Sequence, residues 1–322
     1  MPANEIQAST PLRMVPVGCP ACSATDSILV GSGYDFEYGT SPDLFRAHRC
    51  LECGSVYLSP RPEVSEFTRI YPSSYHSLSF TEERYSLVHK VRSRLEANRL
   101  LRYCDGVPPD ARILDVGCGD GFHLGLLREY GRDSWTVEGL DIDSRAVEVA
   151  ARHGVTIHEG TIEGAGLPDD HYDVVYTLQT VEHVADPYEM LVGIRRVLKP
   201  GGRLVIVTDN TDTLDFGIFK DRYWGGYHFP RHWTLFDRTS LDRLAVRAGY
   251  ETESIETIVS PVNWTYSIHN YLVDKQAPQW LVNRFTLGST VSLGVFTIVD
   301  GLFQAFGRGA LLNGFFRKPR SS

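Results

Sequence analysis

Two pairs of cysteines near the start of the chain have the spacing of a metal site. Cys19 and Cys22 form one Cys-x-x-Cys pair, and Cys50 and Cys53 form the other. Each pair can bring two thiolates onto one ion, and two pairs complete the tetrahedral four-sulfur shell that structural zinc prefers. The spacing therefore predicts a closed zinc site that contributes folding free energy to a small N-terminal module. A redox dithiol and incidental cysteines are the alternatives.

A glycine-rich turn in the middle of the chain has the composition of a ligand-binding loop. The short apolar run 113–114 with Val116 predicts a buried strand, and Gly117, Gly119 and Gly121 allow the backbone to turn tightly against a ligand before a helix begins. An acidic segment, residues 139–143, follows about 20 residues later, as in folds that bind a nucleotide-containing cofactor. The same glycines also occur in plain turns, and the carboxylates of the acidic segment could cap a helix.

Three histidines have the chemistry of a general base, because the pKa of histidine lies near neutral pH. His183 stands in a Glu-His-Val sequence, whereas His228 and His232 stand in an aromatic segment. For His183, an equal alternative is a structural role in which the side chain holds its own loop in place.

The aromatic segment itself, residues 223–233, concentrates Tyr, Trp, His and Arg around two glycines. Its composition predicts either a lid over an acceptor site or a packed aromatic loop. Tyr227 and Arg231 are the candidate acceptor ligands, because a guanidinium pairs well with a phosphate or a carboxylate.

Five motifs in a characteristic order resemble those of class I S-adenosylmethionine-dependent methyltransferases. They occupy residues 113–121, 139–143, 172–175, 182–184 and 196–202. A nicotinamide cofactor is the competing ligand of such folds. It is disfavoured because the turn reads Gly-Cys-Gly-Asp-Gly rather than Gly-x-Gly-x-x-Gly.

The resemblance implies that S-adenosylmethionine binds at the carboxyl ends of the strands. Asp141 ends the second strand, where its carboxylate would accept both ribose hydroxyls. Thr161 stands where the family often has an aspartate beside the adenine, so backbone or Glu163 would meet the adenine amine instead. Gln179 would lie near the methyl group. The residues implied in cofactor binding are Asp115, Gly117, Cys118, Gly119, Asp141, Ile142, Thr161, Ile162 and Gln179.

The alternation of apolar runs and helical segments predicts an α/β fold, and the resemblance implies the Rossmann-like seven-stranded sheet of class I methyltransferases. Residues 251–259 predict the sixth strand and residues 311–319 the final, antiparallel strand, with a helical insertion at 260–310 between them. The other predicted strands are residues 112–116, 136–141, 155–159, 172–178 and 203–208, and the predicted helices are residues 122–129, 144–152, 187–197 and 239–248.

The chain divides into three parts in this interpretation. Residues 1–76 form the zinc module with a proline-rich connector, residues 77–110 form a linker helix, and residues 111–322 form the catalytic domain. The lid occupies residues 211–238. A hairpin at about residues 34–45 fills the long interval between the two cysteine pairs.

Composition and charge limit the partners and the location. The chain has 322 residues and a net charge of -8, which disfavours a nucleic-acid partner. The first ten residues contain no basic region followed by an apolar core, so the sequence predicts a cytoplasmic protein with reduced thiols.

The end of the insertion differs from the rest of the chain. Residues 279–322 carry five Arg and Lys residues against one acidic residue, Asp300, which gives a local charge of +4. Residues 285–299 are apolar but diluted by glycine and serine, a pattern that favours an amphipathic helix on an anionic bilayer over a spanning helix. Peripheral contact of residues 279–320 with a membrane is one interpretation of this pattern, and the protein would then be membrane-associated. The alternatives are a helix pair that covers the acceptor pocket and a homodimer interface.

Together, the residues and the resemblance predict a methyltransferase with a small or lipid-linked acceptor. The N-terminal pattern is similar to zinc modules that some methyltransferases of sugar and polysaccharide pathways carry. The first expectation is therefore a sugar or glycan precursor, methylated on oxygen or carbon. The alternatives are a membrane-associated lipid or quinone-like phenol, an RNA, and a cofactor-binding protein without turnover.

Overall fold

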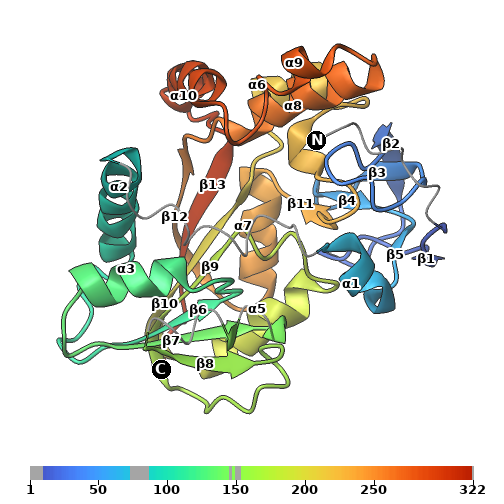
Figure 1. The fold of residues 1–322 in the computed structure, drawn as a ribbon. Helices are drawn as coiled ribbons and strands as arrows, with labels where there is room; N and C mark the ends of the chain where they lie inside the picture. Colours follow the sequence, from blue (N-terminus) through green and yellow to red (C-terminus); the bar gives the residue numbers. More distant parts are fainter. Residues whose placement is uncertain (1–9, 73–86, 145–146, 149–153, 321–322) are drawn as a thin grey trace.

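The structure, a computed structural model, describes residues 10–72, 87–144, 147–148 and 154–320 (Figure 1). The helix predicted at 144–152 lies largely outside these ranges, as does the start of the linker helix.

Seven strands form the central sheet. They are β6 (Arg112–Val116), β7 (Thr136–Asp141), β8 (Thr156–Glu159), β9 (Tyr172–Leu178), β10 (Leu198–Asp209), β12 (Glu251–Ile258) and β13 (Leu311–Arg317). Their order in the sheet is β12-β13-β10-β9-β6-β7-β8, and β13 runs antiparallel to both of its neighbours. The predicted Rossmann-like α/β sheet is therefore confirmed.

Helices cover both faces of this sheet, which explains why its central strands β6, β9 and β10 are largely buried. They are α2 (Leu87–Tyr103), α3 (Phe122–Tyr130), α5 (Pro187–Val197) and α7 (Arg238–Arg247). Val205 points to the face covered by α2 and α3, whereas its neighbours Leu204 and Ile206 point to the face covered by α5 and α7. The carboxyl ends of the parallel strands are thereby left as the open edge where a ligand can bind.

A smaller sheet belongs to the N-terminal module. Its strands are β2 (Ser27–Gly33), β3 (Phe45–Cys50), β4 (Val56–Leu58) and β11 (Thr234–Leu235), in the order β11-β4-β3-β2. The hairpin predicted at residues 34–45 is displaced, because its strands are β2 and β3 and residues 34–44 form the loop between them. The outer strand β11 comes from the catalytic part of the chain, so segments distant in sequence complete this sheet.

The remaining elements of the module lead towards the catalytic part. β1 (Met14–Val15) pairs with β5 (Arg61–Pro62), and the short helix α1 (Phe67–Ile70) follows. The module and the catalytic part share one core, since Cys19 and Tyr57 lie in the same buried cluster as Leu114 and Met190.

Three helices form the insertion between β12 and β13. They are α8 (Val262–Asp274), α9 (Gln279–Val282) and α10 (Thr290–Gln304). One carboxylate joins the two ends of the insertion, because Oδ2 of Asp300 accepts the N–H of Ser260 at 2.9 Å and of Ala310 at 3.1 Å. Burial raises the pKa of Asp300 to about 6. None of the helices in the described ranges combines the length and the apolar character that crossing a bilayer requires.

Candidate active site

A cavity of about 470 Å³ opens at the carboxyl ends of β6, β7 and β9. One side is formed by the residues implied in cofactor binding, and the other by aromatic side chains and His183. The predicted cofactor residues that line it are Gly117, Gly119, Asp141, Ile142, Thr161, Ile162 and Gln179.

The glycine turn after β6 brings the backbone close to this cavity. Gly117 has a φ of +81°, and a Cβ there would lie 2.3 Å from Oγ1 of Thr180, so only glycine fits. Asp141 faces the turn, and its two carboxylate oxygens accept the N–H groups of Gly119 and Asp143, each at 2.9 Å. Burial raises the pKa of Asp141, while these two donors oppose the shift. The carboxylate is thereby held in one orientation, with its remaining lone pairs available for the hydroxyls of a ribose.

Asp115 and Cys118 lie beneath the turn rather than on the cavity wall. Asp115 is buried, and this burial raises its pKa well above the ordinary value, with nearby Asp141 adding to the shift. The thiol of Cys118 packs under Gly139, where a Cβ would lie 2.7 Å from the sulfur. Both residues therefore support the cofactor side from below.

The opposite wall of the cavity comes from the N-terminal module. Val64, Phe67 and Tyr71 line it together with Trp233. The rings of Phe67 and Tyr71 pack with their centroids 4.3 Å apart, and the Tyr71 hydroxyl lies 2.8 Å from Nδ1 of His183. The sequence interpretation missed these residues because it assigned their segment to a connector. The concentration of aromatic residues and prolines in that segment was the signal that could have indicated a role in the cavity.

Of the three histidines predicted as bases, His183 lines the cavity. The ring of His232 packs against that of His183, with the ring centroids 4.5 Å apart. Nδ1 of His228 lies 2.9 Å from a carboxylate oxygen of Glu37. Burial lowers the pKa of His183 well below the ordinary value and that of His232 to about 4. Both imidazoles are therefore neutral near pH 7 and able to accept a proton.

A buried carboxyl stands behind these histidines. Oε2 of Glu182 accepts the hydroxyl of Thr208 at 2.9 Å, and Oε1 has no hydrogen-bond partner among the described residues. Burial raises the pKa of Glu182 well above its ordinary value, and Asp209 adds to the shift. Ligand atoms of Glu182, His183 and His232 lie within 4.8 Å of one another. A carboxyl with a raised pKa beside two imidazoles with lowered pKa values fits a network that shares protons.

Asp209 is a further site residue that the sequence interpretation missed. It ends β10, and its Oδ1 accepts Nδ2 of Asn263 at 2.6 Å. Its Oδ2 lies 3.3 Å from Nε2 of Gln179 and 3.5 Å from Nδ1 of His232, and burial raises its pKa to about 6. Asp209 thus connects the cofactor side, the histidines and helix α8. Its place at a strand end was the usable signal.

The aromatic segment is packed in this structure, since residues 224–236 are all buried. The Tyr227 hydroxyl donates to a backbone carbonyl at 2.8 Å. Arg231 has no exposed surface, pairs with Asp35 at 2.9 Å and donates to the carbonyl of Ile70 at 2.7 Å. The structure therefore does not bring Tyr227 or Arg231 to the cavity, because a buried guanidinium needs a buried anion as its partner.

The four predicted metal ligands come together. The sulfurs of Cys19 and Cys53 lie 3.5 Å apart, as do those of Cys22 and Cys50, and all four lie within 4.8 Å of one another. A disulfide requires about 2.05 Å, whereas tetrahedral zinc thiolates have sulfur–sulfur distances of about 3.8 Å. The donor set and its spacing therefore fit zinc.

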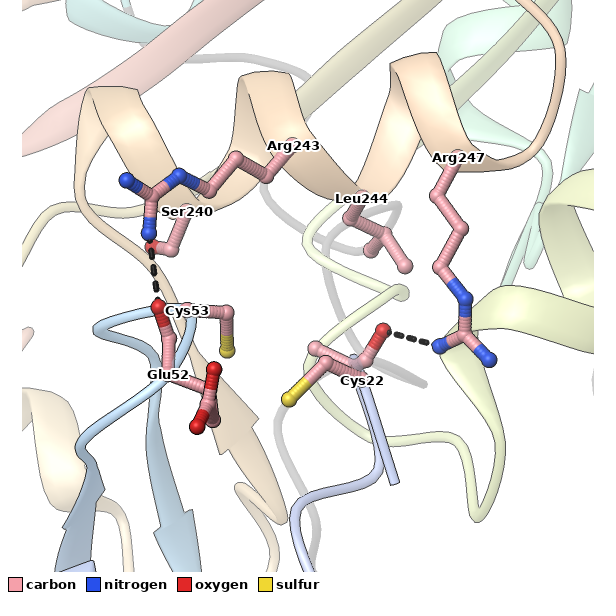
Figure 2. Close-up of a pocket in the computed structure, with 8 residues that line it drawn as sticks. Cys22, Glu52, Cys53, Ser240, Arg243, Leu244 and Arg247 are labelled. Carbon is pink, nitrogen blue, oxygen red and sulfur yellow. Dashed lines mark hydrogen bonds between the residues drawn. The ribbon is translucent and has the colours of Figure 1, made fainter. Parts of the chain in front are cut away.

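Two arginines of helix α7 form hydrogen bonds to both cysteine loops (Figure 2). Nη1 of Arg243 donates to the carbonyl of Glu52 at 2.8 Å, and Nη1 of Arg247 donates to that of Ala21 at 2.7 Å. Each carbonyl belongs to the residue immediately before a cysteine. The two guanidiniums border a cavity of about 360 Å³ beside the sulfurs, where they would offset the formal charge of about -2 on a four-thiolate zinc site.

Comparisons with known proteins are consistent with this geometry. Residues 86–255, more than half of the chain, match the family described as "Methyltransferase domain". A ubiquinone biosynthesis O-methyltransferase of Cereibacter sphaeroides is 32% identical over 169 residues, which cover 49% of this chain and 67% of that protein. An uncharacterized protein in a transposon of Streptomyces fradiae is 39% identical over 164 residues, and the match spans 47% of each chain.

One solved structure, a SAM-dependent methyltransferase from Archaeoglobus fulgidus, aligns with a TM-score of 0.47 at 20% identity over 70% of this chain and 94% of that one. The match to the family covers the glycine turn, the cofactor side of the cavity and His183. The chain therefore belongs to this methyltransferase family and is an S-adenosylmethionine-dependent methyltransferase.

Proposed function

We propose that this enzyme methylates a hydroxyl group on an uncharged aromatic acceptor, a phenol. The acceptor end of the cavity carries this proposal, because Phe67, Tyr71 and Trp233 form an aromatic wall beside His183. Such a wall suits a planar ring, which can stack or meet these side chains edge to face. The ubiquinone biosynthesis O-methyltransferase of C. sphaeroides supports oxygen as the accepting atom.

The charges around the cavity distinguish this acceptor from a nucleotide-linked sugar. Within the described ranges no Arg or Lys lines the cavity, whereas Asp143, Glu163, Asp186 and Glu189 do. A diphosphate bound there would meet carboxylates and no described cation, although phosphates require cationic or N–H partners. The cavity thus favours the phenol over the sugar precursor that the N-terminal module suggested.

The residues of the cavity have separable roles in this reaction. When bound, S-adenosylmethionine supplies an electrophilic methyl group on a sulfonium centre. His183 takes the proton of the acceptor hydroxyl at Nε2, because its Nδ1 faces the Tyr71 hydroxyl at 2.8 Å and the carbonyl of Arg231 at 3.2 Å. Tyr71 is a positioning residue that fixes the imidazole plane, and the aromatic wall keeps water from the reacting atoms.

Asp141→Asn is expected to weaken cofactor binding by about 100-fold. The substitution removes the charge that strengthens hydrogen bonds to both ribose hydroxyls, which corresponds to about 3 kcal/mol. Calorimetric titration with S-adenosylmethionine measures the change. Glu159→Gln is the matched control, because Glu159 ends the adjacent strand, opposite Asp141 in register, and does not line the cavity. Equal affinity in the wild type and Asp141→Asn would remove Asp141 from the cofactor site.

An acceptor panel tests the proposal directly. Purified enzyme with methyl-labelled S-adenosylmethionine would be offered phenols and catechols, nucleotide-linked sugars, and transfer RNA. Labelled methyl ether formed only from the phenols is the expected result, with a reaction lacking enzyme as the blank. Preferential labelling of a nucleotide-linked sugar or of RNA would overturn the phenol assignment while leaving the methyltransferase assignment intact.

A further inference from the structure

Helix α10 presents a continuous apolar stripe to solvent. Its members are between 51% and 82% exposed. The members within the helix recur every three or four residues, so they lie on one face of it. Figure 1 shows α10 and α9 at the edge of the molecule, away from α1 and α5. Residues of α1 and α5 border the cavity. The stripe consists of Val291, Val295, Ile298 and Leu302 of α10, and of Phe306, which follows the end of the helix.

The inner face of α10 is firmly attached, so the stripe does not result from a loosely packed helix. Phe296 stacks on Trp264 of α8 with ring centroids 5.9 Å apart and an interplanar angle of 6°. Ser292 and Asp300 are buried on the same side, and Asp300 holds both ends of the insertion. The apolar stripe is therefore a stable surface of the folded protein.

The segment that carries the stripe has exposed cations. Residues 275–310 contain Lys275, Arg284 and Arg308, whereas their one acidic residue, Asp300, is 1% exposed. Lys275 lies 3.7 Å from Asp274, and Arg308 lies 2.7 Å from Asp212, so these two charges are already paired. Arg284 has no ion pair among the described residues, and an anionic partner is complementary to it.

An exposed tryptophan lies beside Arg284. Trp280 of α9 is 65% exposed, and the guanidinium of Arg284 lies 5.8 Å from the centre of its ring. Figure 1 shows α9 along the same edge of the molecule as α10. An exposed tryptophan and a cation on the same side as an apolar stripe are typical of the boundary between headgroups and acyl chains.

We propose that this surface, the α10 stripe with Trp280 and Arg284, docks on an anionic lipid bilayer. The apolar side chains enter the interface, and the cations lie against the headgroup phosphates. A second copy of the chain fits less well, because a two-fold interface on this surface would place equal positive charges opposite each other. Docking of this kind is independent of the identity of the acceptor.

Vesicle sedimentation with the full-length protein tests this inference. One set of vesicles contains phosphatidylcholine alone, and the other contains equal parts of phosphatidylcholine and phosphatidylglycerol. Binding is expected on the anionic vesicles and to weaken as salt is raised. The double variant Val295→Glu, Ile298→Glu should bind at least tenfold more weakly. Arg284→Gln should bind about fivefold more weakly, as expected for about 1 kcal/mol per surface cation.

Val246→Glu is the matched control, because Val246 is 54% exposed on α7, outside the stripe, and its variant should bind like the wild type. Cofactor titration verifies that each variant folds. If the double variant does not fold, two other variants test the proposal. Arg284→Gln should bind the anionic vesicles more weakly, and Trp280→Phe should lose the fluorescence shift that vesicles induce in the wild type.

Three results would overturn the proposal. They are equal binding to neutral and anionic vesicles, no binding by the wild type, and an equal loss of binding in Val246→Glu. A wild-type dimer that the double variant converts to a monomer, without vesicle binding, would assign the surface to a second copy of the chain.

Discussion

His183→Asn is expected to lower kcat/KM by about 10² to 10⁴-fold, the range for loss of a general base. His183 lines the cavity, and the Tyr71 hydroxyl holds its Nδ1 at 2.8 Å, so proton transfer to Nε2 has a defined direction. Asparagine can keep a polar contact in place of Nδ1 but has no basic nitrogen. Steady-state rates with the best acceptor of the panel measure the loss, and cofactor affinity should stay within a few-fold of the wild type.

The pH profile distinguishes a base from a structural histidine. Burial lowers the pKa of His183, with His232 and His228 adding to the shift, so the neutral imidazole persists below the value of about 6.5 for free histidine. The wild-type kcat/KM should therefore be constant between about pH 6.5 and 8 and fall only at lower pH. Tyr71→Phe should lower the rate by about tenfold and move this acid limb, since Nδ1 loses a partner.

A histidine outside the cavity provides the control for both measurements. His158 lies on β8 and contacts Glu138 at 3.1 Å, so His158→Asn should leave the rate and its pH dependence unchanged. The general-base role fails if His183→Asn retains the wild-type rate, or if its loss is matched by that of His158→Asn.

Cys53→Ser is expected to remove zinc, unfold the N-terminal module and abolish methyl transfer. Structural zinc contributes about 10–16 kcal/mol to a small module, which equals or exceeds the whole stability of an ordinary domain. The module also carries Phe67 and Tyr71, so its unfolding removes the aromatic wall of the cavity. Elemental analysis, thermal unfolding and the acceptor assay on the same preparation measure the three effects.

Two variants separate metal binding from the loss of any buried polar group. Cys104→Ser changes a buried thiol outside the cluster and should keep about one zinc per chain. Ser55→Ala removes a hydroxyl 3.1 Å from the sulfur of Cys19 and 3.0 Å from that of Cys53, and should weaken zinc binding by about 10 to 100-fold. Full activity in a zinc-free Cys53→Ser protein would refute the structural role. Loss of activity on chelation while zinc remains would point to the cluster of Glu182, His183 and His232 as a second metal site.

The central sheet could be predicted because its signals are local. Alternating apolar runs and helical segments report period and burial directly. Helix α5 begins and ends at the predicted residues, since Asp186 caps it through the N–H groups of Tyr188 and Glu189, Pro187 starts it, and Leu198 already begins β10. The cysteine cluster could be predicted for the same reason, because the spacing within each Cys-x-x-Cys pair brings its two sulfurs together locally.

The acceptor end could not be predicted, because it depends on contacts between residues far apart in the chain. Tyr71 lies 112 residues before His183, and Asp35 lies 196 residues before Arg231. A sequence pattern shows that an arginine stands among aromatic residues, which suits a ligand-binding loop. It does not show that a carboxylate from another strand connection neutralises that arginine inside the core. Burial decides between these roles, and burial is a property of the assembled fold.

The strand order β11-β4-β3-β2 also has a consequence for synthesis on the ribosome. All four cysteines have been incorporated once residue 53 has been translated, whereas β11 ends at residue 235. The module can therefore bind its metal early, but β4 keeps an open edge until most of the chain exists. A nascent chain released before residue 235 would carry this unpaired edge, which is a template for association with other chains.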